Sequence, residues 1–282
     1  MVKRGFADMC AKEDGNSCVY NYHEESGIAF WISSDCPKPD EVIRSVLMPI
    51  EESGYVYAST KRKNIYLGFQ KSCFVKKYKL PGLYRKLHGK QYAPREFLEI
   101  SEVRKRGIGT PRVLAYFEVK LLKCLNVMNG LCIEYADATR AVKLEEQDKI
   151  VSCVVDLYRK GIYHPDFNPM NILTSDSMDY CLPIDFIGSY FSDVPSKMSL
   201  ILNMARFIQF TKLKDEAKQI QLLEKIIYYL PELLAEGDVE EIRKKTSTFS
   251  ELDLSNDKMH QILHGERMKS IFDCNIDYGF FK

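Results

Sequence analysis

The chain has 282 residues, of which 45% are hydrophobic and 28% are charged, and its formal net charge is +1. This composition is typical of a soluble globular protein, and the length suits one large domain or two lobes. No apolar run approaches the roughly 20 residues of a membrane span, and residues 1–15 are charged without an apolar core, so neither a span nor a secretory signal is expected.

Nine cysteines are present, and none forms a C-x-x-C pair. Cys73, Cys132 and Cys153 lie inside apolar runs, which is typical of buried, reduced thiols rather than of a disulfide framework or a zinc site. The cysteine usage therefore indicates a cytoplasmic protein.

Charge is unevenly distributed, since residues 56–107 contain fourteen Lys or Arg and three Glu. Such a basic block favours contact with phosphates or with an anionic membrane surface, although a solvated face is the simpler reading for any single lysine. Nucleic acid is not expected, because no aromatic residues are interleaved for base stacking.

The first 80 residues predict short strands. Residues 1–53 contain one clear strand at 27–34 and a proline turn at 36–42 that leads into a short helix. Three segments rich in Tyr, Val and Ile follow, separated by polar turns, and they predict an antiparallel meander: 52–60, 64–70 and 72–80.

Helical periodicity begins at residues 93–107, where Phe97, Ile100 and Val103 recur on one face and Gly107 ends the helix. Two strands follow at 111–120 and 130–137. The remaining predicted elements are a helix at 143–161, strands at 171–175 and 181–186, and helices at 198–213, 216–237 and 238–245.

This order predicts an α+β fold of two lobes. A small antiparallel sheet of five strands with one inserted helix would span residues 54–136, and a larger helical lobe would span 137–282. Residues 1–53 would be an N-terminal extension of unknown role or would add strands to the small lobe.

The stretch at residues 164–185 carries the strongest chemical signal. His164, Asp166 and Asn171 form the pattern H-x-D-x-x-x-x-N, which is the spacing of a kinase catalytic loop. Asp166 would accept or orient the proton of an acceptor hydroxyl. Asn171 and Asp185 offer the hard oxygen ligands that Mg²⁺ prefers.

The upstream strands offer the other parts that phosphoryl transfer from ATP needs. Lys76 lies in the third meander strand behind apolar residues, and Glu96 in the following helix is a partner for its ammonium group. The backbone of Glu134 and Ala136, with Ile133 behind it, would meet adenine. Ser59 and Thr60 in the first turn would meet the phosphates, with Lys61 or Lys63 adding charge.

Each of these residues also has a plain structural interpretation. His164 is more often a structural hydrogen-bonding residue, Asp166 beside a proline can start a turn, and Asp185 can cap a loop. Glu96 can stabilise a helix N-terminus. Lys76 and Lys77 are adjacent in a strand, so one is expected to face solvent, and the apolar neighbours favour Lys76 as the inward one. Five parts of a kinase occur in the expected chain order on the expected elements, which favours the kinase-like interpretation. They are Lys76, Glu96, the segment 133–136, the H-x-D-x-x-x-x-N loop and Asp185.

With these motifs the chain resembles the protein-kinase-like superfamily. It is most similar there to the lipopolysaccharide core kinases, which act on Kdo and heptose sugars. The segments that carry this resemblance are residues 73–118, 161–174, 183–190 and 203–212. The resemblance implies transfer of the γ-phosphate of ATP to a sugar hydroxyl of a glycolipid at the inner face of the cytoplasmic membrane. RIO-type kinases and aminoglycoside phosphotransferases share the H-x-D and I-D-F parts.

The chain also departs from regulated protein kinases. The first turn has no G-x-G-x-x-G, Pro165 replaces the arginine of the catalytic loop, and Ile187 interrupts D-F-G. No A-P-E follows Asp185, which favours a small hydroxyl acceptor or an unregulated kinase. A RIO-like Ser/Thr protein kinase and a pseudokinase binding module remain as alternatives, and the oligomeric state is open.

Overall fold

The structure of the protein is a computed structural model. It describes residues 20–61, 63–80, 92–121, 125–136, 140–211, 216–233, 238–252, 256–265 and 268–270. These residues belong to two compact units. The first lies within residues 20–101 and 111–135, and the second comprises residues 102–110 and the part of the chain that follows residue 135.

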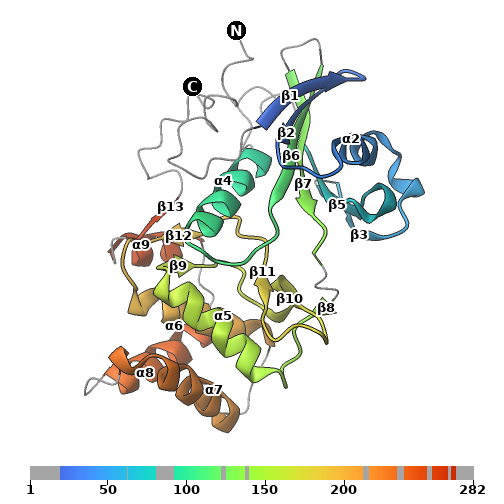
Figure 1. The fold of residues 1–282 in the computed structure, drawn as a ribbon. Helices are drawn as coiled ribbons and strands as arrows, with labels where there is room; N and C mark the ends of the chain where they lie inside the picture. Colours follow the sequence, from blue (N-terminus) through green and yellow to red (C-terminus); the bar gives the residue numbers. More distant parts are fainter. Residues whose placement is uncertain are drawn as a thin grey trace. The chain divides into compact units, whose positions relative to one another are not determined.

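The first unit is built on a seven-stranded sheet whose neighbouring strands are all antiparallel, in the order β1-β2-β6-β7-β5-β4-β3 (Figure 1). Its strands are β1 (Tyr20–Glu25), β2 (Ile28–Ser33), β3 (Val56–Ser59), β4 (Lys63–Leu67), β5 (Cys73–Lys79), β6 (Val113–Leu121) and β7 (Leu125–Glu134). Two short 3₁₀ turns lie between the strands, η1 (Ile50–Glu52) and η2 (Phe69–Lys71).

The hairpin of β1 and β2 closes through Ser26 and Gly27, which both have positive φ angles. Two such residues make the tight turn whose twist matches a β-hairpin. β1 was not predicted, because its sequence is polar and five of its six side chains are exposed.

Helix α2 (Pro39–Leu47) covers one face of the sheet. Pro39 lies in its first turn, and its buried residues Val42, Ile43 and Val46 join an apolar cluster with side chains of β2, β4, β5, β6 and β7. Lys77 also points to this side, where its ammonium group donates to the Val46 carbonyl at 2.8 Å. The expectation that Lys77 faces solvent is therefore wrong, since α2 covers the second face of β5, and burial lowers the pKa of Lys77.

Helix α4 (Tyr92–Lys105) contributes Glu96 to the opposite face of the sheet, where it meets Lys76 and Tyr78 of β5. α4 ends at the predicted glycine, since Gly107 has a φ of +83° and its N–H donates to the Arg104 carbonyl at 2.8 Å. The two faces of the sheet thus differ in chemistry, because the α2 face is mainly apolar apart from Lys77, whereas the other face holds the buried ion pair of Lys76 and Glu96.

The second unit is mainly helical (Figure 1). Its helices are α5 (Gln147–Arg159), α6 (Lys197–Thr211), α7 (Glu216–Tyr229), α8 (Asp238–Glu251) and α9 (Asn256–Gly265), with the 3₁₀ turns η3 (Pro169–Asn171) and η4 (Pro231–Leu233). Its strands form two small sheets, one of β8 (Arg140–Ala141), β10 (Ile172–Thr174) and β11 (Leu182–Pro183), the other of β9 (Ile162–Tyr163), β12 (Tyr190–Phe191) and β13 (Lys269–Ser270).

The predicted α+β fold, with a sheet-containing part and a helical part, is confirmed. The sheet has seven strands, because β1 and the predicted strand β2 join the five strands expected over residues 54–136, which is one of the two roles predicted for residues 1–53, and α2 follows the predicted proline turn. The helix predicted over 216–237 ends at Tyr229, since Pro231 cannot continue the backbone hydrogen bonding. Within the described part of the chain, no helix is long and apolar enough to cross a membrane.

Candidate active site

Asp166 lies in a loop of the second unit that holds its carboxylate from two sides. The side-chain amide of Asn168 donates to its Oδ1 at 3.0 Å, and the amide of Asn171 donates to its Oδ2 at 2.7 Å. Both amides also donate to the Asp166 backbone carbonyl at 2.9 Å. The carboxylate is half-buried, and the two amide donors set its orientation.

Local sequence explains why the loop takes this shape. Asn168 accepts the Met170 N–H at 2.9 Å as the cap of η3, and Pro169 occupies the first position of that turn. The Asn171 N–H then donates to the Asn168 carbonyl at 3.0 Å. A single 3₁₀ turn therefore brings residues 166, 168 and 171 together.

His164 is fully buried and both its ring nitrogens are engaged. Nε2 donates to the Ile184 carbonyl at 2.8 Å, and Nδ1 accepts the Asp166 N–H at 3.2 Å. Burial lowers the pKa of His164, so the ring is neutral at physiological pH. This geometry makes His164 a positioning residue for the Asp166 backbone.

Asp185 is placed next to this loop through its neighbour Ile184. The Ile184 carbonyl is held by His164, and its N–H donates to the Asn171 carbonyl at 2.9 Å. Asp185 itself has a φ of +63°, a left-handed conformation that is strained for most side chains and tolerated by aspartate. The next residue, Phe186, is fully buried with its ring centroid 4.6 Å from that of His164.

Asn203 of α6 holds the start of this loop through two hydrogen bonds. Its Oδ1 accepts the His164 N–H at 2.9 Å, and its Nδ2 donates to the Ile162 carbonyl at 3.0 Å, with the side chain fully buried. Neither Asn203 nor Asn168 was among the predicted site residues. The signal for Asn203 was a single amide inside the apolar helical run of residues 198–208.

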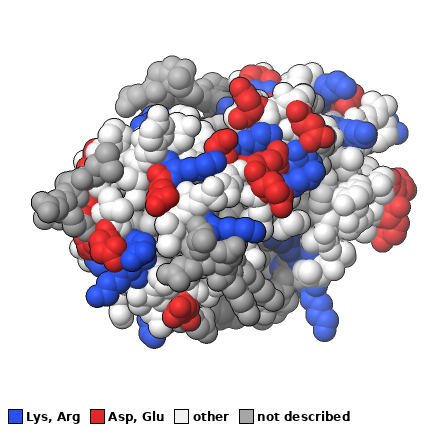
Figure 2. Space-filling view, turned by 90° about the horizontal axis from the view of Figure 1, so that it is seen from below, with Lys and Arg blue, Asp and Glu red and all other residues white. Residues whose placement is uncertain are grey.

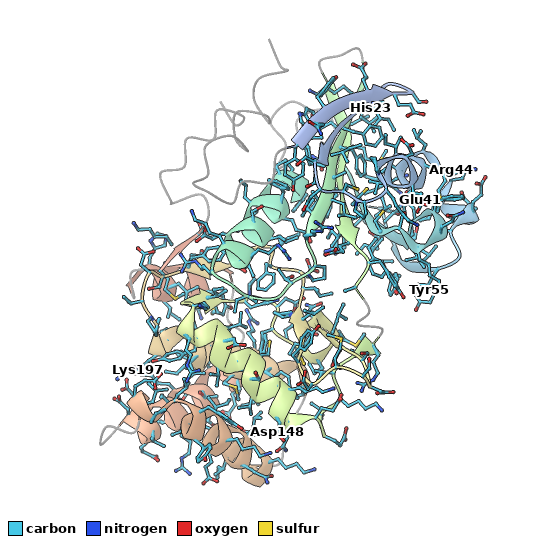
Figure 3. The ribbon with its side chains drawn as sticks, viewed as in Figure 1. His23, Glu41, Arg44, Tyr55, Asp148 and Lys197 are labelled. Atoms are coloured by element: carbon cyan, nitrogen blue, oxygen red, sulfur yellow. The ribbon has the colours of Figure 1, made fainter. Side chains whose placement is uncertain are left out.

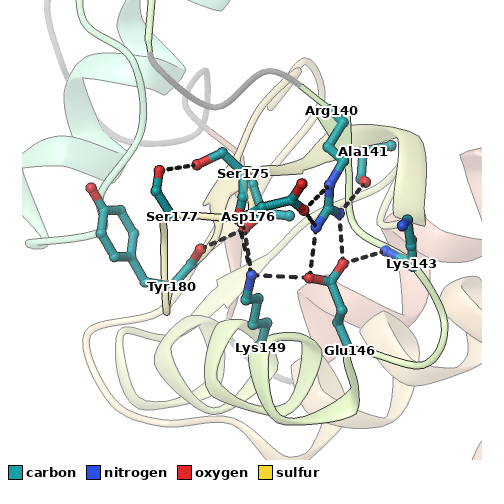
Figure 4. A network of polar contacts seen from close by, with 10 residues as sticks. Arg140, Ala141, Lys143, Glu146, Lys149, Ser175, Asp176, Ser177 and Tyr180 are labelled. Carbon is teal, nitrogen blue, oxygen red and sulfur yellow. Dashed lines mark hydrogen bonds and ion pairs between the residues drawn. The ribbon is translucent and has the colours of Figure 1, made fainter.

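A polar network anchors the hairpin of β10 and β11 that follows Asn171 (Figure 4). Arg140 donates two bonds to Glu146, at 2.7 and 3.0 Å, and also binds Asp176. Lys149 links Glu146 to Thr174 at 3.0 and 3.1 Å. The bonds from Arg140 hold the pKa of Glu146 well below its usual range, so this carboxylate stays charged at physiological pH.

In the first unit, Lys76 and Glu96 form an ion pair that is almost completely buried. The second carboxylate oxygen of Glu96 accepts the Tyr78 hydroxyl at 2.6 Å. Since both oxygens of Glu96 have donors, the carboxylate is fully satisfied and holds the Lys76 ammonium group in one orientation.

The other predicted nucleotide contacts lie at the ends of strands. The Thr60 hydroxyl donates to the Lys63 carbonyl at 3.0 Å, and the Ser59 hydroxyl donates to Asn64 Oδ1 at 3.3 Å, so both hydroxyl protons are used inside the turn. The Glu134 N–H donates to the Arg112 carbonyl at 2.9 Å, and Ala136 follows β7 as a half-buried residue.

The oxygen atoms of Asn171 and Asp185 fit a hard cation. The bonds to Asp166 use the Asn171 amide nitrogen, which leaves its carbonyl oxygen for a metal. Within the described ranges, no group of three or more His, Cys, Asp or Glu is placed to hold a metal. Mg²⁺ does not require one, because it takes one or two carboxylates and completes its shell with water and phosphate oxygens.

A curated protein and a solved structure are similar to parts of this chain. No family model matches the chain. The chain is 27% identical over 177 residues to a protein of Archaeoglobus fulgidus described as a probable serine/threonine-protein kinase BUD32 homolog, covering 62% of this chain and 82% of that protein. A solved structure described as WaaP in complex with acyl carrier protein is 18% identical, with a TM-score of 0.48, and the match covers 76% of this chain and 98% of that one.

The predicted resemblance to protein-kinase-like proteins is confirmed at the level of the superfamily, because the curated relative is itself named as a kinase. The same name supports the predicted enzyme class, a phosphotransferase. The structure brings Asp166, Asn171, His164 and the Asp185 backbone together in the second unit, and Lys76 and Glu96 together in the first.

Proposed function

We propose that this protein transfers the γ-phosphate of ATP, with Mg²⁺, to an alcohol hydroxyl, and that the hydroxyl belongs to a Kdo or heptose sugar of a lipopolysaccharide core. The observation that carries the proposal is the Asp166 carboxylate, half-buried and held by the amides of Asn168 and Asn171. A fixed, ionised carboxylate beside hard metal ligands is what phosphoryl transfer to a hydroxyl requires.

In this proposal the second unit carries the chemistry. Asp166 accepts the proton of the acceptor hydroxyl, and its two amide donors keep one carboxylate geometry through the reaction. The Asn171 carbonyl oxygen and the Asp185 carboxylate would hold the Mg²⁺ ion. His164 and Asn203 hold the loop and are not expected to exchange protons, because His164 is neutral with both nitrogens engaged.

The first unit supplies the cation for the phosphates. The Lys76 ammonium group meets the α- and β-phosphates, and Glu96 keeps it oriented and charged. Bound Mg-ATP supplies the phosphoryl group and a cation that neutralises the charge of the phosphates. The Thr60 N–H and hydroxyl both donate to the Lys63 carbonyl. Binding of the phosphates is therefore expected to depend more on Lys76 than on the turn at residues 59–63.

The acceptor is proposed from two features. Only residues 186–196 separate Asp185 from α6, and residues 186–191 of these are taken up by a tight turn and β12. This leaves little chain to grip an extended peptide, which favours a compact acceptor, and the resemblance of residues 73–118 and 161–212 points to core sugars. Contact with an anionic membrane is proposed from the basic block at residues 56–107. On the face shown in Figure 2, basic and acidic side chains are interspersed.

A second acceptor is a serine or threonine of a protein. The relative named as a probable serine/threonine-protein kinase matches over 82% of its own length, which supports this alternative.

Radiolabelled ATP with Mg²⁺ separates these proposals. The full chain is incubated with rough-core glycolipid, with free core sugars and with basic proteins, and Asp166→Asn is assayed in parallel. Labelled glycolipid that disappears with Asp166→Asn supports the first acceptor, and labelled protein with the same dependence supports the second. Mg-ATP binding without transfer to any acceptor would instead identify a pseudokinase.

A further inference from the structure

A pocket of about 280 Å³ lies among the helices α6, α7 and α8 of the second unit (Figure 1). α6 and α8 are linked where they begin, because Lys197 donates to Asp238 at 2.6 Å (Figure 3 shows Lys197). They are linked again near their ends, where the Gln209 amide donates to the Leu252 carbonyl at 3.4 Å. These two helices therefore run side by side in the same direction, and residues of α7 complete the lining of the pocket.

The buried part of the lining is mostly apolar. Met204 and Ile208, one turn apart on α6, and Leu223 of α7 line the pocket and are 0%, 6% and 5% exposed. Apolar side chains at this depth favour a ligand with an apolar body, because water gains few hydrogen bonds there. The volume lies just below the roughly 300–1,000 Å³ of sites for drug-sized ligands, so the pocket suits a small molecule.

Thr246 of α8 is the polar exception in the buried part of the lining. It is 4% exposed, and its hydroxyl has no hydrogen-bond partner within the described part of the chain. A threonine inside a helix often donates to the carbonyl four residues earlier, as Thr211 and Thr248 do at 2.8 and 2.9 Å. A buried hydroxyl without a partner is destabilising. One rotation about the Cα–Cβ bond exchanges its hydroxyl and methyl positions, so a bound acceptor can satisfy this donor.

The outer part of the lining carries two opposite charges. Arg243 and Glu251 of α8 are exposed and lie eight positions apart, with Ser247 midway, so they share one side of the helix over about 12 Å. Arg243 also pairs with Glu240 at 3.2 Å, an exposed contact of the kind that contributes little to stability. A guanidinium group matches a carboxylate, whereas the Glu251 carboxylate matches an ammonium group.

We propose that this pocket binds a small zwitterion with an apolar body, which is the chemistry of a free amino acid with a branched or aromatic side chain. Its carboxylate pairs with Arg243 and accepts the Thr246 hydroxyl, its ammonium group pairs with Glu251, and its side chain packs on the buried residues of α6 and α7. Both ligand charges are required, because Glu251 repels a plain anion and Arg243 repels a plain cation. The proposal is independent of the function proposed above, in which the lining residues have no part.

Calorimetry on the full chain, without nucleotide, tests the proposal. The probes are leucine and phenylalanine, together with 4-methylpentanoate, which lacks the ammonium group of leucine, and 3-methylbutylamine, which lacks its carboxylate. Arg243→Met removes the cation, and Thr246→Val replaces the hydroxyl by a methyl group of similar volume. Thr248→Val is the matched control, because Thr248 is an exposed threonine of the same helix whose hydroxyl donates to the Lys244 carbonyl.

Leucine or phenylalanine is expected to bind, and both truncated analogues are expected to bind about 10- to 150-fold more weakly, the range for loss of a hydrogen bond to a charged group. Arg243→Met is expected to weaken amino-acid binding by the same factor, and Thr246→Val by about tenfold. The thermal midpoint of ligand-free Thr246→Val should not fall, because no hydrogen bond is lost. Thr248→Val should bind like the unmodified chain.

A folded chain that binds neither amino acid would overturn the proposal. An analogue that binds as tightly as leucine would show that one of the two charges has no role, and the zwitterion would then be the wrong ligand class. Amino-acid binding that Arg243→Met and Thr246→Val both leave intact would place the ligand outside this pocket. Phosphoryl transfer does not enter the experiment, so none of these results bears on the proposed kinase function.

Discussion

The two units hold their key carboxylates in opposite ways. Glu96 in the first unit is completely buried, and a cation and a phenol occupy its two oxygens. Asp166 in the second unit is half-buried, and neutral amides hold it from two sides. The first carboxylate belongs to a closed ion pair, whereas the second is held by amide groups of its own loop.

This difference separates stability from turnover. A buried charge that loses its partner is strongly destabilising, because it cannot be solvated. Replacing the half-buried Asp166 carboxylate by an amide leaves one of its two donors without an acceptor, which costs less than an unpaired buried charge, and it removes the proposed proton acceptor. Substitutions at the two carboxylates are therefore expected to differ in kind.

The largest expected effect is on turnover. Asp166→Asn is expected to lower kcat by about 10²- to 10⁴-fold, the contribution of a general base, with a smaller loss of stability than Glu96→Leu, because one of its two amide donors loses its acceptor. Initial rates with radiolabelled ATP and a thermal melt measure the two quantities. Asp148→Asn, at an 82% exposed carboxylate of α5, is the matched control and should leave both unchanged. Full activity of Asp166→Asn would show that Asp166 is not the proton acceptor.

The next effect is on stability. Glu96→Leu leaves the Lys76 ammonium group buried without its partner and is expected to lower the free energy of unfolding by ~3–5 kcal/mol. The double variant Lys76→Met with Glu96→Leu should recover most of this loss, because neither charge of this buried ion pair remains. Urea titration of the single and double variants measures both values. A double variant no more stable than Glu96→Leu would mean that the lost packing, rather than the orphaned charge, causes the effect.

A smaller loss of stability is expected for substitutions of Asn203, whose side chain bonds to the His164 N–H. Asn203→Leu removes the partners of the His164 N–H and the Ile162 carbonyl, both inside the unit, and is expected to cost ~1–3 kcal/mol in stability. Turnover should fall as well, because His164 positions the Asp166 backbone. Asn203→Asp keeps the acceptor for His164 and should retain more activity than Asn203→Leu. Equal activity of the two variants would argue against this positioning role.

The smallest expected effect is a pH dependence of stability. Burial lowers the pKa of His164 in the folded chain, so the unfolded chain takes up a proton first as the pH falls below ~6.5. The stability contributed by the neutral ring is therefore complete above that pH and is lost towards the lowered pKa, with a slope of at most ~1.4 kcal/mol per pH unit. Urea titrations from pH 8 to pH 5 should show a flatter profile for His164→Gln than for the unmodified chain. His23→Gln, at an exposed histidine of β1, should leave the slope unchanged.

Much of the site was readable from local chemistry. The spacing of His164, Asp166 and Asn171 predicts a loop that one 3₁₀ turn closes, and the turn residues Asn168 and Pro169 lie within it. Gly107 and Gly161 both have the positive φ angles that helix ends favour, which is why the ends of α4 and α5 were predictable. The α+β class followed from period-2 segments preceding the long period-3.6 segments.

The sequence by itself determined where helices and turns begin and end and which loop holds His164, Asp166 and Asn171, because caps, turns and amphipathic periods depend on neighbours a few positions away. Only the tertiary structure decided that Lys77 is covered by α2, that Asn203 holds His164, and that Phe74 contacts Tyr57 and Tyr135. These contacts join residues that lie 17 to 61 positions apart in the chain. Such pairings depend on strand order and helix packing, which one sequence does not specify locally.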